Sequence, residues 1–443
     1  MYSAYLDLSP TRVRGARALG RVSRRSYFGP FAPLRVRRFP TPALPGRRWI
    51  RVRNIVSGVA LDEVERTLVG WDSKVAPQAT PQPARVYLGR QVVGEVVEAG
   101  PDARLLRVGD RVVYQTGPCC ATHEIEPPCH QCAVGSYALC ENRFLPGLEQ
   151  IGGGWSDEMI VHERQMFLTP DGLTPEQAAL LEPAAEALRV ALRYHPEPED
   201  LALVLGAETQ GLLITQALRA LAHSLNITVA PQQGYQVEVA TRMGATRILY
   251  PEDGDDAVAR MTEGKLFRGR SGAQMLVGGF DVVYDTLGTE NSLRQSLLWA
   301  REGGFVVMAG RPQRWLRLDP TLIWSREVSL LGVHAHGAES WPDAPELAPS
   351  IVSGGRITTF TLAAQMMREN LLTPERLVTH RFPLREVRAA ITTMRDRVEH
   401  KAVQALLDIR DVAGSALLTE NKAAAASAPP GGRARRSAPG ARA

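Results

Sequence analysis

Short runs of alternating apolar and polar residues follow one another from residue 49, and Gly and Pro interrupt the chain between them. Runs of this length bounded by turn residues are typical of β-strands. Turn signals stand at Gly100-Pro101 and Gly109-Asp110. The pattern predicts a β-rich first domain with strands over Ile50–Ile55, Gly89–Val97 and Arg111–Tyr114.

From Leu201 onward, short apolar runs alternate with segments of helical periodicity. This alternation predicts a parallel, doubly wound sheet of the Rossmann type, covered by helices. The expected strands are Leu201–Leu205, Ile227–Val229, Arg247–Leu249, Asp281–Tyr284, Phe305–Met308 and Val328–Leu331, with helices over Leu212–Leu221, Gln236–Met243 and Ser292–Arg301.

Beyond Gly332 the pattern loosens, and Phe382-Pro383-Leu384 followed by an amphipathic helix indicates a return to the first domain. A chain of 443 residues exceeds what one core usually supports, so we expect an α/β domain inserted into a β-rich one. The expected parts are a basic, partly disordered N-terminal segment (1–48), the first domain (49–190), the inserted domain (191–332), the return (333–410) and a disordered tail (411–443).

The net charge of +5 is concentrated at the two ends of the chain. Residues 1–50 carry +10 and residues 411–443 carry +3, which leaves −8 for the part between them. A body of that sign is a poor platform for nucleic acid, and no apolar run is long enough to span a membrane. We therefore expect a cytoplasmic protein that binds neither. The Arg-rich start lacks the apolar core of a signal peptide, and a mobile or strand-forming segment is favoured over a targeting peptide.

Several glycine-rich and acidic landmarks occur in a fixed order between residues 49 and 410. Together they resemble the zinc-containing alcohol dehydrogenase branch of the medium-chain dehydrogenase/reductase superfamily. The resemblance implies an α/β protein with a GroES-like catalytic domain and an inserted Rossmann-type domain. It is carried by Gly94-Glu95-Val96-Val97-Glu98-Ala99-Gly100, Val108-Gly109-Asp110-Arg111-Val112, Gly152-Gly153-Gly154-Trp155-Ser156, Leu181-Glu182-Pro183, Phe280–Asp285 and Gly303–Val307.

All five cysteines fall within residues 119–140, and Cys129, Cys132 and Cys140 have the spacing of the structural zinc loop in that family. The fourth ligand would be Cys120 or, at the usual close spacing, Glu126. Either completes a tetrahedral site. Free thiols or a disulfide-linked lobe remain the alternative. His123 and His130 are further candidates, although an exposed loop position is the simpler interpretation of each.

The resemblance also implies a catalytic zinc held by a Cys-Gly-Ser/Thr-Asp turn, a Gly-His-Glu turn and a later Cys or Glu. We match the first turn to Ser57-Gly58-Val59-Ala60 and the second to Gly89-Arg90-Gln91, which leaves Glu182 as the one credible ligand. Val59 stands where a hydroxyl would relay the proton. A catalytic zinc is therefore not expected, because one carboxylate cannot hold the ion. We hypothesise that Arg90 pairs with Glu182 and replaces the metal electrostatically; the alternative is an Arg90 that points to solvent.

The dinucleotide loop after the first parallel strand is altered as well. Gly206 and Gly211 match the outer glycines of G-x-G-x-x-G, but Glu208 replaces the middle one and brings a like charge toward the pyrophosphate. Pro231 follows the second strand, where an acid would bind the adenosine ribose. Binding of NAD(P) is therefore doubted, and the glycines are explained equally well by a tight packed turn.

Three functions remain open at this point. The first is an oxidoreductase by ancestry with weak or no dehydrogenase activity, which serves as a binding or assembly protein. The second is a zinc-independent, NADPH-linked reductase of the same superfamily, and the third is a zinc dehydrogenase with substitute ligands. An unknown small molecule is the expected partner, and a homodimer is expected by resemblance. Ser57, Glu182, His334 and His336 are the polar groups to examine for activity, although a loop histidine pair is more often solvated.

Overall fold

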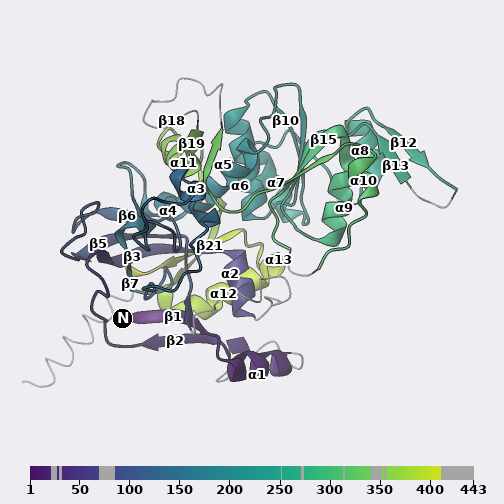
Figure 1. Cartoon of the computed structure of the whole chain (residues 1–443). Coiled ribbons are helices and arrows are strands. Elements are labelled where there is room, and N and C mark those ends of the chain that lie inside the picture. Colours follow the sequence, from purple (N-terminus) through teal and green to yellow (C-terminus); the bar gives the residue numbers. More distant parts are fainter. Residues whose placement is uncertain are drawn as a thin grey trace, which may run out of the picture.

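The computed structural model describes residues 1–20, 27–28, 32–68, 85–250, 252–270, 274–312, 315–340, 352–353 and 356–410 (Figure 1). The expected tail, 411–443, lies outside the described residues.

The first domain is built around the long strand β3 (Trp49–Val59), which is buried along most of its length. Apolar residues alternate along β3, so one face packs on the core while its edges pair with neighbouring strands. The seven-stranded sheet has the order β20-β21-β3-β5-β6-β8, and β7 also pairs with β3. Its other strands are β5 (Val92–Ala99), β6 (Arg111–Tyr114), β7 (Glu158–His162), β8 (Met166–Leu168), β20 (Val378–Pro383) and β21 (Gln404–Asp408).

After the inserted sheet the chain comes back to the first sheet at β21, which pairs antiparallel with β3 and sets Leu407 opposite Ser57. The second domain is therefore an insertion between β8 and β20.

The inserted domain is a six-stranded parallel sheet in the order β11-β10-β9-β14-β15-β16. This is the doubly wound order in which ligands bind at the carboxyl ends of the strands, beside the first strand β9. The predicted alternation of strands and helices is confirmed. The strands are β9 (Leu201–Leu205), β10 (Asn226–Ala230), β11 (Arg247–Ile248), β14 (Phe280–Asp285), β15 (Ala300–Met308) and β16 (Ser329–Gly332); the helices are α6 (Thr209–Leu221), α7 (Tyr235–Arg242), α8 (Gly254–Met261), α9 (Glu290–Trp299) and α10 (Thr321–Trp324).

Helix α5 (Leu181–Leu192) joins the two domains and is buried on nearly every side. One continuous apolar core includes Val56 and Val93 of the first sheet, Leu188 of α5 and Val204 of the parallel sheet. The apolar side chains of α5 pack into this shared core, and this fixes the position of the helix between the domains. The acidic residues at the start of α5 are held rigidly as a result.

The N-terminal segment forms a small sheet with the order β2-β1-β4. Residues 1–48 were expected to be either mobile or strand-forming. They contain two strands, β1 (Tyr2–Asp7) and β2 (Leu34–Arg38), and the chain between these strands includes α1 (Pro10–Gly20). The third strand, β4 (Arg85–Tyr87), belongs to the first domain.

The remaining elements are short and complete the two domains. They are α2 (Leu61–Thr67), α3 (His130–Ala133), α4 (Pro175–Ala179), the hairpin β12 (Lys265–Arg268) and β13 (Gln274–Val277), β17 (Ala338–Ser340), β18 (Val352–Ser353), β19 (Arg356–Thr358), α11 (Thr359–Arg368), α12 (Val387–Arg395), α13 (Arg397–His400) and single 3-10 turns at Tyr137–Leu139, Glu163–Gln165, Pro374–Leu377 and Leu384–Glu386. Within the described ranges, no helix has both the length and the apolar composition needed to cross a membrane.

Candidate functional site

A cavity of about 1320 Å³ lies between the two domains. Its walls come from the turn into α2, the loop at Arg90, the start of α5 and the carboxyl ends of β9, β14 and β15. This is the edge of a doubly wound sheet at which ligands are expected. The cavity therefore brings together Arg90 and Glu182, which the sequence analysis assigned to the catalytic metal site, and Glu208 of the dinucleotide loop.

Arg90 is held between two carboxylates on one wall of this cavity. Its Nε donates to Oε1 of Glu182 over 3.1 Å, and its Nη1 donates to both carboxylate oxygens of Asp62 over 2.8 and 2.7 Å. Burial alone would lower the pKa of Arg90, but the charges of Asp62 and Glu182 outweigh it and raise that pKa well above its ordinary value. The ion pair hypothesised between Arg90 and Glu182 is thus present, and Asp62 is a partner that the sequence analysis missed.

Ser57 does not reach the cavity. Its side chain is fully buried within β3, and it lies so close to Gly154 that a Cβ on that glycine would be 2.4 Å from the hydroxyl oxygen. Val59 is likewise buried and does not line the cavity. The structure therefore does not support Ser57 as a ligand position or Val59 as a relay position.

The turn that does face the cavity begins three residues later, at Ala60. Ala60 is the N-cap of α2, and Ala60, Leu61 and Asp62 line the cavity, followed in the chain by the buried Glu63. When these four residues are aligned with the family turn Cys-Gly-Ser/Thr-Asp, Ala60 replaces the cysteine ligand and Asp62 replaces the Ser/Thr. Glu63 then stands at the position of the final Asp. The acid in the fourth position was the signal that could have located the turn from the sequence.

The start of α5 brings two carboxyl groups into the same cavity. Glu182 and Glu186 are one helical turn apart and both line it. The second oxygen of Glu182, Oε2, is buried and has no hydrogen-bond donor among the described residues. Burial, followed by the charge of Glu182, raises the pKa of Glu186 to about 7.

Glu63 is a fourth acidic group near this site, after Asp62, Glu182 and Glu186. It accepts a hydrogen bond of 2.7 Å from the backbone N–H of Gly89, the residue before Arg90. Burial raises its pKa to about 7, despite the opposing charge of Arg90. Its carboxyl group thus fixes the loop that presents Arg90 to the cavity.

These residues do not fit a catalytic zinc. Such a site needs three protein ligands with an open fourth position, and here Ala60 offers no ligand atom and Arg90 offers a fixed positive charge. In the described part of the chain, the one group whose ligand atoms converge closely enough for a metal is the cysteine cluster. The guanidinium of Arg90 neutralises the carboxylates that would otherwise attract the ion.

The cysteine cluster does fit a structural zinc. The ligand atoms of Cys120, Cys129, Cys132 and Cys140 all lie within 4.8 Å of one another. Tetrahedral zinc with bonds of about 2.3 Å to sulfur places its ligand atoms about 3.8 Å apart. The Sγ atoms of Cys120 and Cys140 are 3.7 Å apart, and those of Cys129 and Cys140 are 4.0 Å apart.

Cys120, rather than Glu126, completes this cluster. Glu126 is exposed and is not part of the converging group. The side-chain amide of Asn142 donates to Sγ of Cys120 over 3.1 Å, and its backbone N–H donates to Sγ of Cys140 over 3.3 Å. Hydrogen-bond donors aimed at sulfur stabilise the thiolate form and hold a metal ligand in place. His123 and His130 also lie outside the cluster.

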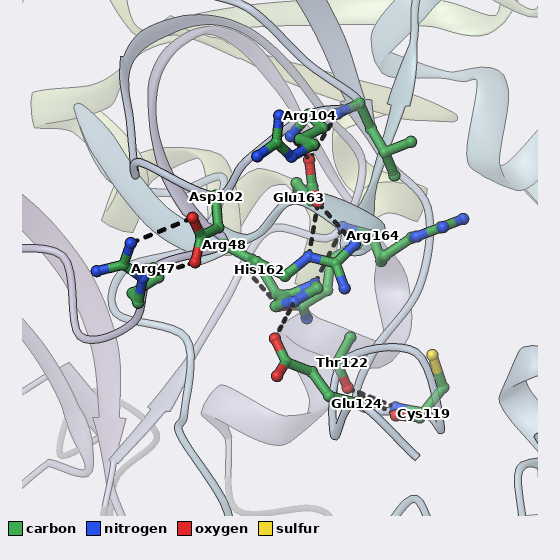
Figure 2. Close-up of polar contacts among 12 residues, drawn as sticks. Arg47, Arg48, Asp102, Arg104, Cys119, Thr122, Glu124, His162, Glu163 and Arg164 are labelled. Atoms are coloured by element: carbon green, nitrogen blue, oxygen red, sulfur yellow. Dashed lines mark hydrogen bonds and ion pairs between the residues drawn. The ribbon is translucent and has the colours of Figure 1, made fainter. Parts of the chain in front are cut away.

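A polar network fastens the cysteine lobe to the first sheet (Figure 2). Thr122 exchanges hydrogen bonds with the backbone of Cys119, and Glu124 lies 3.8 Å from His162 at the end of β7. The neighbouring Glu163 is buried, accepts from Arg48 over 2.9 Å and accepts from two backbone N–H groups at residues 104 and 105. In this network, the contact between Glu124 and His162 joins the lobe to β7, and Glu163 holds the chain that follows β7.

The dinucleotide loop has the conformation of a tight strand-to-helix turn. Gly206 adopts a φ of 105°, and a Cβ on it would lie 2.5 Å from Oγ1 of Thr286. A Cβ on Gly211 would lie 2.1 Å from the carbonyl oxygen of Gly206. Packing alone requires both glycines, so neither residue is by itself a sign of nucleotide binding.

Glu208 and Pro231 occupy the remaining cofactor positions. Glu208 is the N-cap of α6, and its Oε1 accepts from Nε of Arg397 over 2.8 Å. Pro231 is buried directly after β10 and does not line the cavity. Among the described residues at this edge, no carboxylate takes the place of the expected ribose ligand after β10.

The two histidines differ in exposure: His336 is buried, whereas His334 is exposed, as expected for a loop histidine. Both line the cavity, and His336 is 5% exposed, with Nε2 at 2.5 Å from the carbonyl oxygen of Gln115. Burial lowers the pKa of each histidine. Both are neutral at pH 7 as a consequence, and His334 in particular presents a polar group to a ligand.

Two family models match the chain, and together they cover both domains. An alcohol dehydrogenase GroES-like domain matches residues 46–171, and a zinc-binding dehydrogenase domain matches residues 211–350. The chain belongs to the zinc-type medium-chain dehydrogenase/reductase superfamily, a family of zinc-binding dehydrogenases and related oxidoreductases.

Individual relatives agree with this assignment. The chain is 30% identical to (R,R)-butanediol dehydrogenase of Bacillus subtilis over 305 residues, which is 69% of this chain and 76% of the relative. It is 27% identical to sorbitol dehydrogenase of the same organism over 276 residues, 61% of this chain and 72% of the relative. The crystal structure of 2R,3R-butanediol dehydrogenase from Bacillus subtilis superimposes with a TM-score of 0.66 at 25% identity and covers 85% of this chain and 96% of that one.

Proposed function

We propose that this chain keeps the structural zinc and the ligand cavity of its family but has no zinc-catalysed alcohol oxidation, and that it binds a polar small molecule between its domains. One observation carries the proposal. The guanidinium of Arg90 lies between Asp62 and Glu182, where the second ligand and the metal would otherwise be.

The electrostatics of the cavity support this proposal. A zinc dehydrogenase uses the divalent ion to polarise the alcohol oxygen and to lower its pKa before hydride transfer. Arg90 supplies one positive charge and hydrogen-bond donors, but no empty coordination position to which an alkoxide could bind. Arg311, with Nη1 at 3.6 Å from Oδ2 of Asp62, adds a second cation on the same wall.

The nucleotide end of the cavity supports the same conclusion. A dinucleotide places its pyrophosphate at the N-terminus of the helix after the first strand. Here the carboxylate of Glu208 lies at that helix start, where its charge opposes an anionic ligand. Binding of NAD(P) is expected to be weak for this reason.

A zinc-independent reductase is the second candidate. The cavity reaches Thr286 and Met308 at the carboxyl ends of β14 and β15, where a nicotinamide ring could face a substrate near Arg90. Tight binding of NADPH together with a zinc content of one per chain would favour this candidate over the first.

The test combines a metal count with activity and nucleotide titrations on the purified full chain. The named substrates of the relatives, 2,3-butanediol and sorbitol, are offered with NAD and with NADP, with and without added zinc. The proposal predicts one zinc per chain, no nucleotide-dependent oxidation and no saturable binding of NADH. Two zinc ions per chain with oxidation that a chelator abolishes would refute it.

Homodimer formation stays a prediction. Strand β16 is an edge strand of the parallel sheet, so a second copy could pair with it there. Trp324, at the end of the preceding helix α10, is 73% exposed. Sedimentation of the purified chain decides between monomer and dimer.

A further inference from the structure

The helix start that would hold a diphosphate is occupied by the chain itself. Glu208 has an extended backbone, with φ of −77° and ψ of 176°, and its side chain does not cap the backbone of α6. The carboxylate turns instead to Arg397, a residue of α13 in the return segment, with Nε and Oε1 2.8 Å apart. Both side chains line the cavity between the domains.

The second oxygen of Glu208 strengthens the negative charge at this point. Its Oε2 is buried, and none of the described residues donates a hydrogen bond to it. Arg397 thus compensates one side of the carboxylate only. An anionic ligand that approaches the first turn of α6 is repelled by the negative charge of this carboxylate over a short distance in a partly desolvated cleft.

Two further contacts join the same pair of segments. Oγ1 of Thr209, the first residue of α6, donates to the carbonyl oxygen of Val403 over 2.7 Å. The hydroxyl of Tyr235, the first residue of α7, donates to the carbonyl oxygen of Ala402 over 3.4 Å. The return segment is therefore hydrogen-bonded to the first residues of two helices of the inserted domain, in addition to the ion pair.

We infer that Glu208 acts as a built-in anion that occupies a latent diphosphate site, and that Arg397 is the cation that would otherwise face the phosphates. The inference rests on the proposed weakness of nucleotide binding and gives it a specific cause. The rest of the site is intact, because Gly206 and Gly211 retain the turn and α6 still begins at the cavity, which Thr209 and Gln210 line. Removing one carboxylate should then create binding of diphosphate-containing ligands.

The experiment titrates inorganic pyrophosphate, NADH and NADPH into the wild type and into the variants Glu208→Gln and Glu208→Gly. We expect pyrophosphate to bind about tenfold more tightly to Glu208→Gln than to the wild type, since the removed charge lies beside the ligand. Glu208→Gly should also gain NADH binding, because the backbone can then approach the pyrophosphate. The double variant Glu208→Gln, Arg397→Ala should lose the gain.

Glu252→Gln is the matched control, because Glu252 is an exposed acid in the same domain, and its loss changes the net charge equally. Thermal unfolding establishes that each variant is folded. Binding of pyrophosphate that is equally weak in folded Glu208→Gln, Glu252→Gln and wild type would overturn the inference and leave the proposed function standing. Tight NADH binding by the wild type would overturn the proposed function itself.

Discussion

Gly211 packs directly against the backbone of Gly206, and a Cβ on Gly211 would lie 2.1 Å from the carbonyl oxygen of Gly206. The substitution Gly211→Ala is therefore expected to destabilise the protein by roughly 1–3 kcal/mol, the usual cost of overpacking. Gly234→Ala is the control, because a Cβ there meets no atom within 4 Å. Denaturant unfolding of both variants measures the difference, and equal stabilities would contradict the packing interpretation.

Zinc content should depend on the four clustered cysteines and not on the fifth. We expect Cys120→Ser to lower bound zinc to well below one per chain and to lower the melting temperature, because three ligands hold structural zinc poorly. Cys119 is equally buried and adjacent but lies outside the cluster, so Cys119→Ser should retain the metal. Metal analysis after exhaustive dialysis reads out both variants. Similar losses in the two variants would show that the ligand set is wrong.

A second zinc site should appear when the missing ligands are restored in the register that the structure gives. The double substitution Ala60→Cys, Arg90→His supplies a thiolate and an imidazole beside Glu182, and zinc should rise from one to two per chain. The double substitution Ser57→Cys, Arg90→His introduces the same two ligand types but should leave the count at one, because Ser57 is buried outside the cavity. Two zinc ions in the second variant, but not in the first, would favour the register predicted from the sequence.

Glu186 should make stability depend on pH in a defined window. Burial, followed by the charge of Glu182, raises its pKa in the folded state to about 7, above the ordinary value of 4.5. Between these two values the folded state holds a proton that the unfolded state has lost, so stability falls as pH rises from about 4.5 to about 7. Glu186→Gln removes this contribution.

The variant Glu186→Gln should consequently gain roughly 1–3 kcal/mol over the wild type at pH 8 and little at pH 4.5. Free energies of unfolding measured at pH 4.5, 6, 7 and 8 test this. The exposed Glu252→Gln should leave the pH profile unchanged. A constant offset between Glu186→Gln and the wild type at every pH would rule out titration of Glu186 as the cause.

Periodicity located the parallel sheet well because each strand there is a short apolar run between helices. β9 is Leu201–Leu205 in both the prediction and the structure, and the order of the six strands follows the doubly wound pattern. The hairpin β12–β13 was not predicted, since six of its eight residues are exposed and its apolar residues form no alternating pattern. The hairpin contacts α8, and a tertiary contact of this kind cannot be read from the local sequence pattern.

The candidate site was predicted less completely because sequence spacing does not say which residue of a turn faces inward. Arg90 and Glu182 were identified together, and their ion pair is present. The first turn was placed three residues early, at Ser57, because Ser-Gly there imitates the Cys-Gly of the family pattern. Asp62 and Arg397 were missed altogether, since each is defined by a partner 28 or 189 residues away in the chain.

The strand β1 has a consequence for any shortened form of this protein. The matched family region starts at residue 46, yet Ala4 donates its backbone N–H to the carbonyl oxygen of Trp155, and Ala4, Leu6 and Leu34 belong to the same apolar core as Trp155. A chain cut at the family boundary would leave β4 as an unpaired edge above an uncovered tryptophan. Such a fragment should aggregate during expression, whereas the full chain should stay monodisperse.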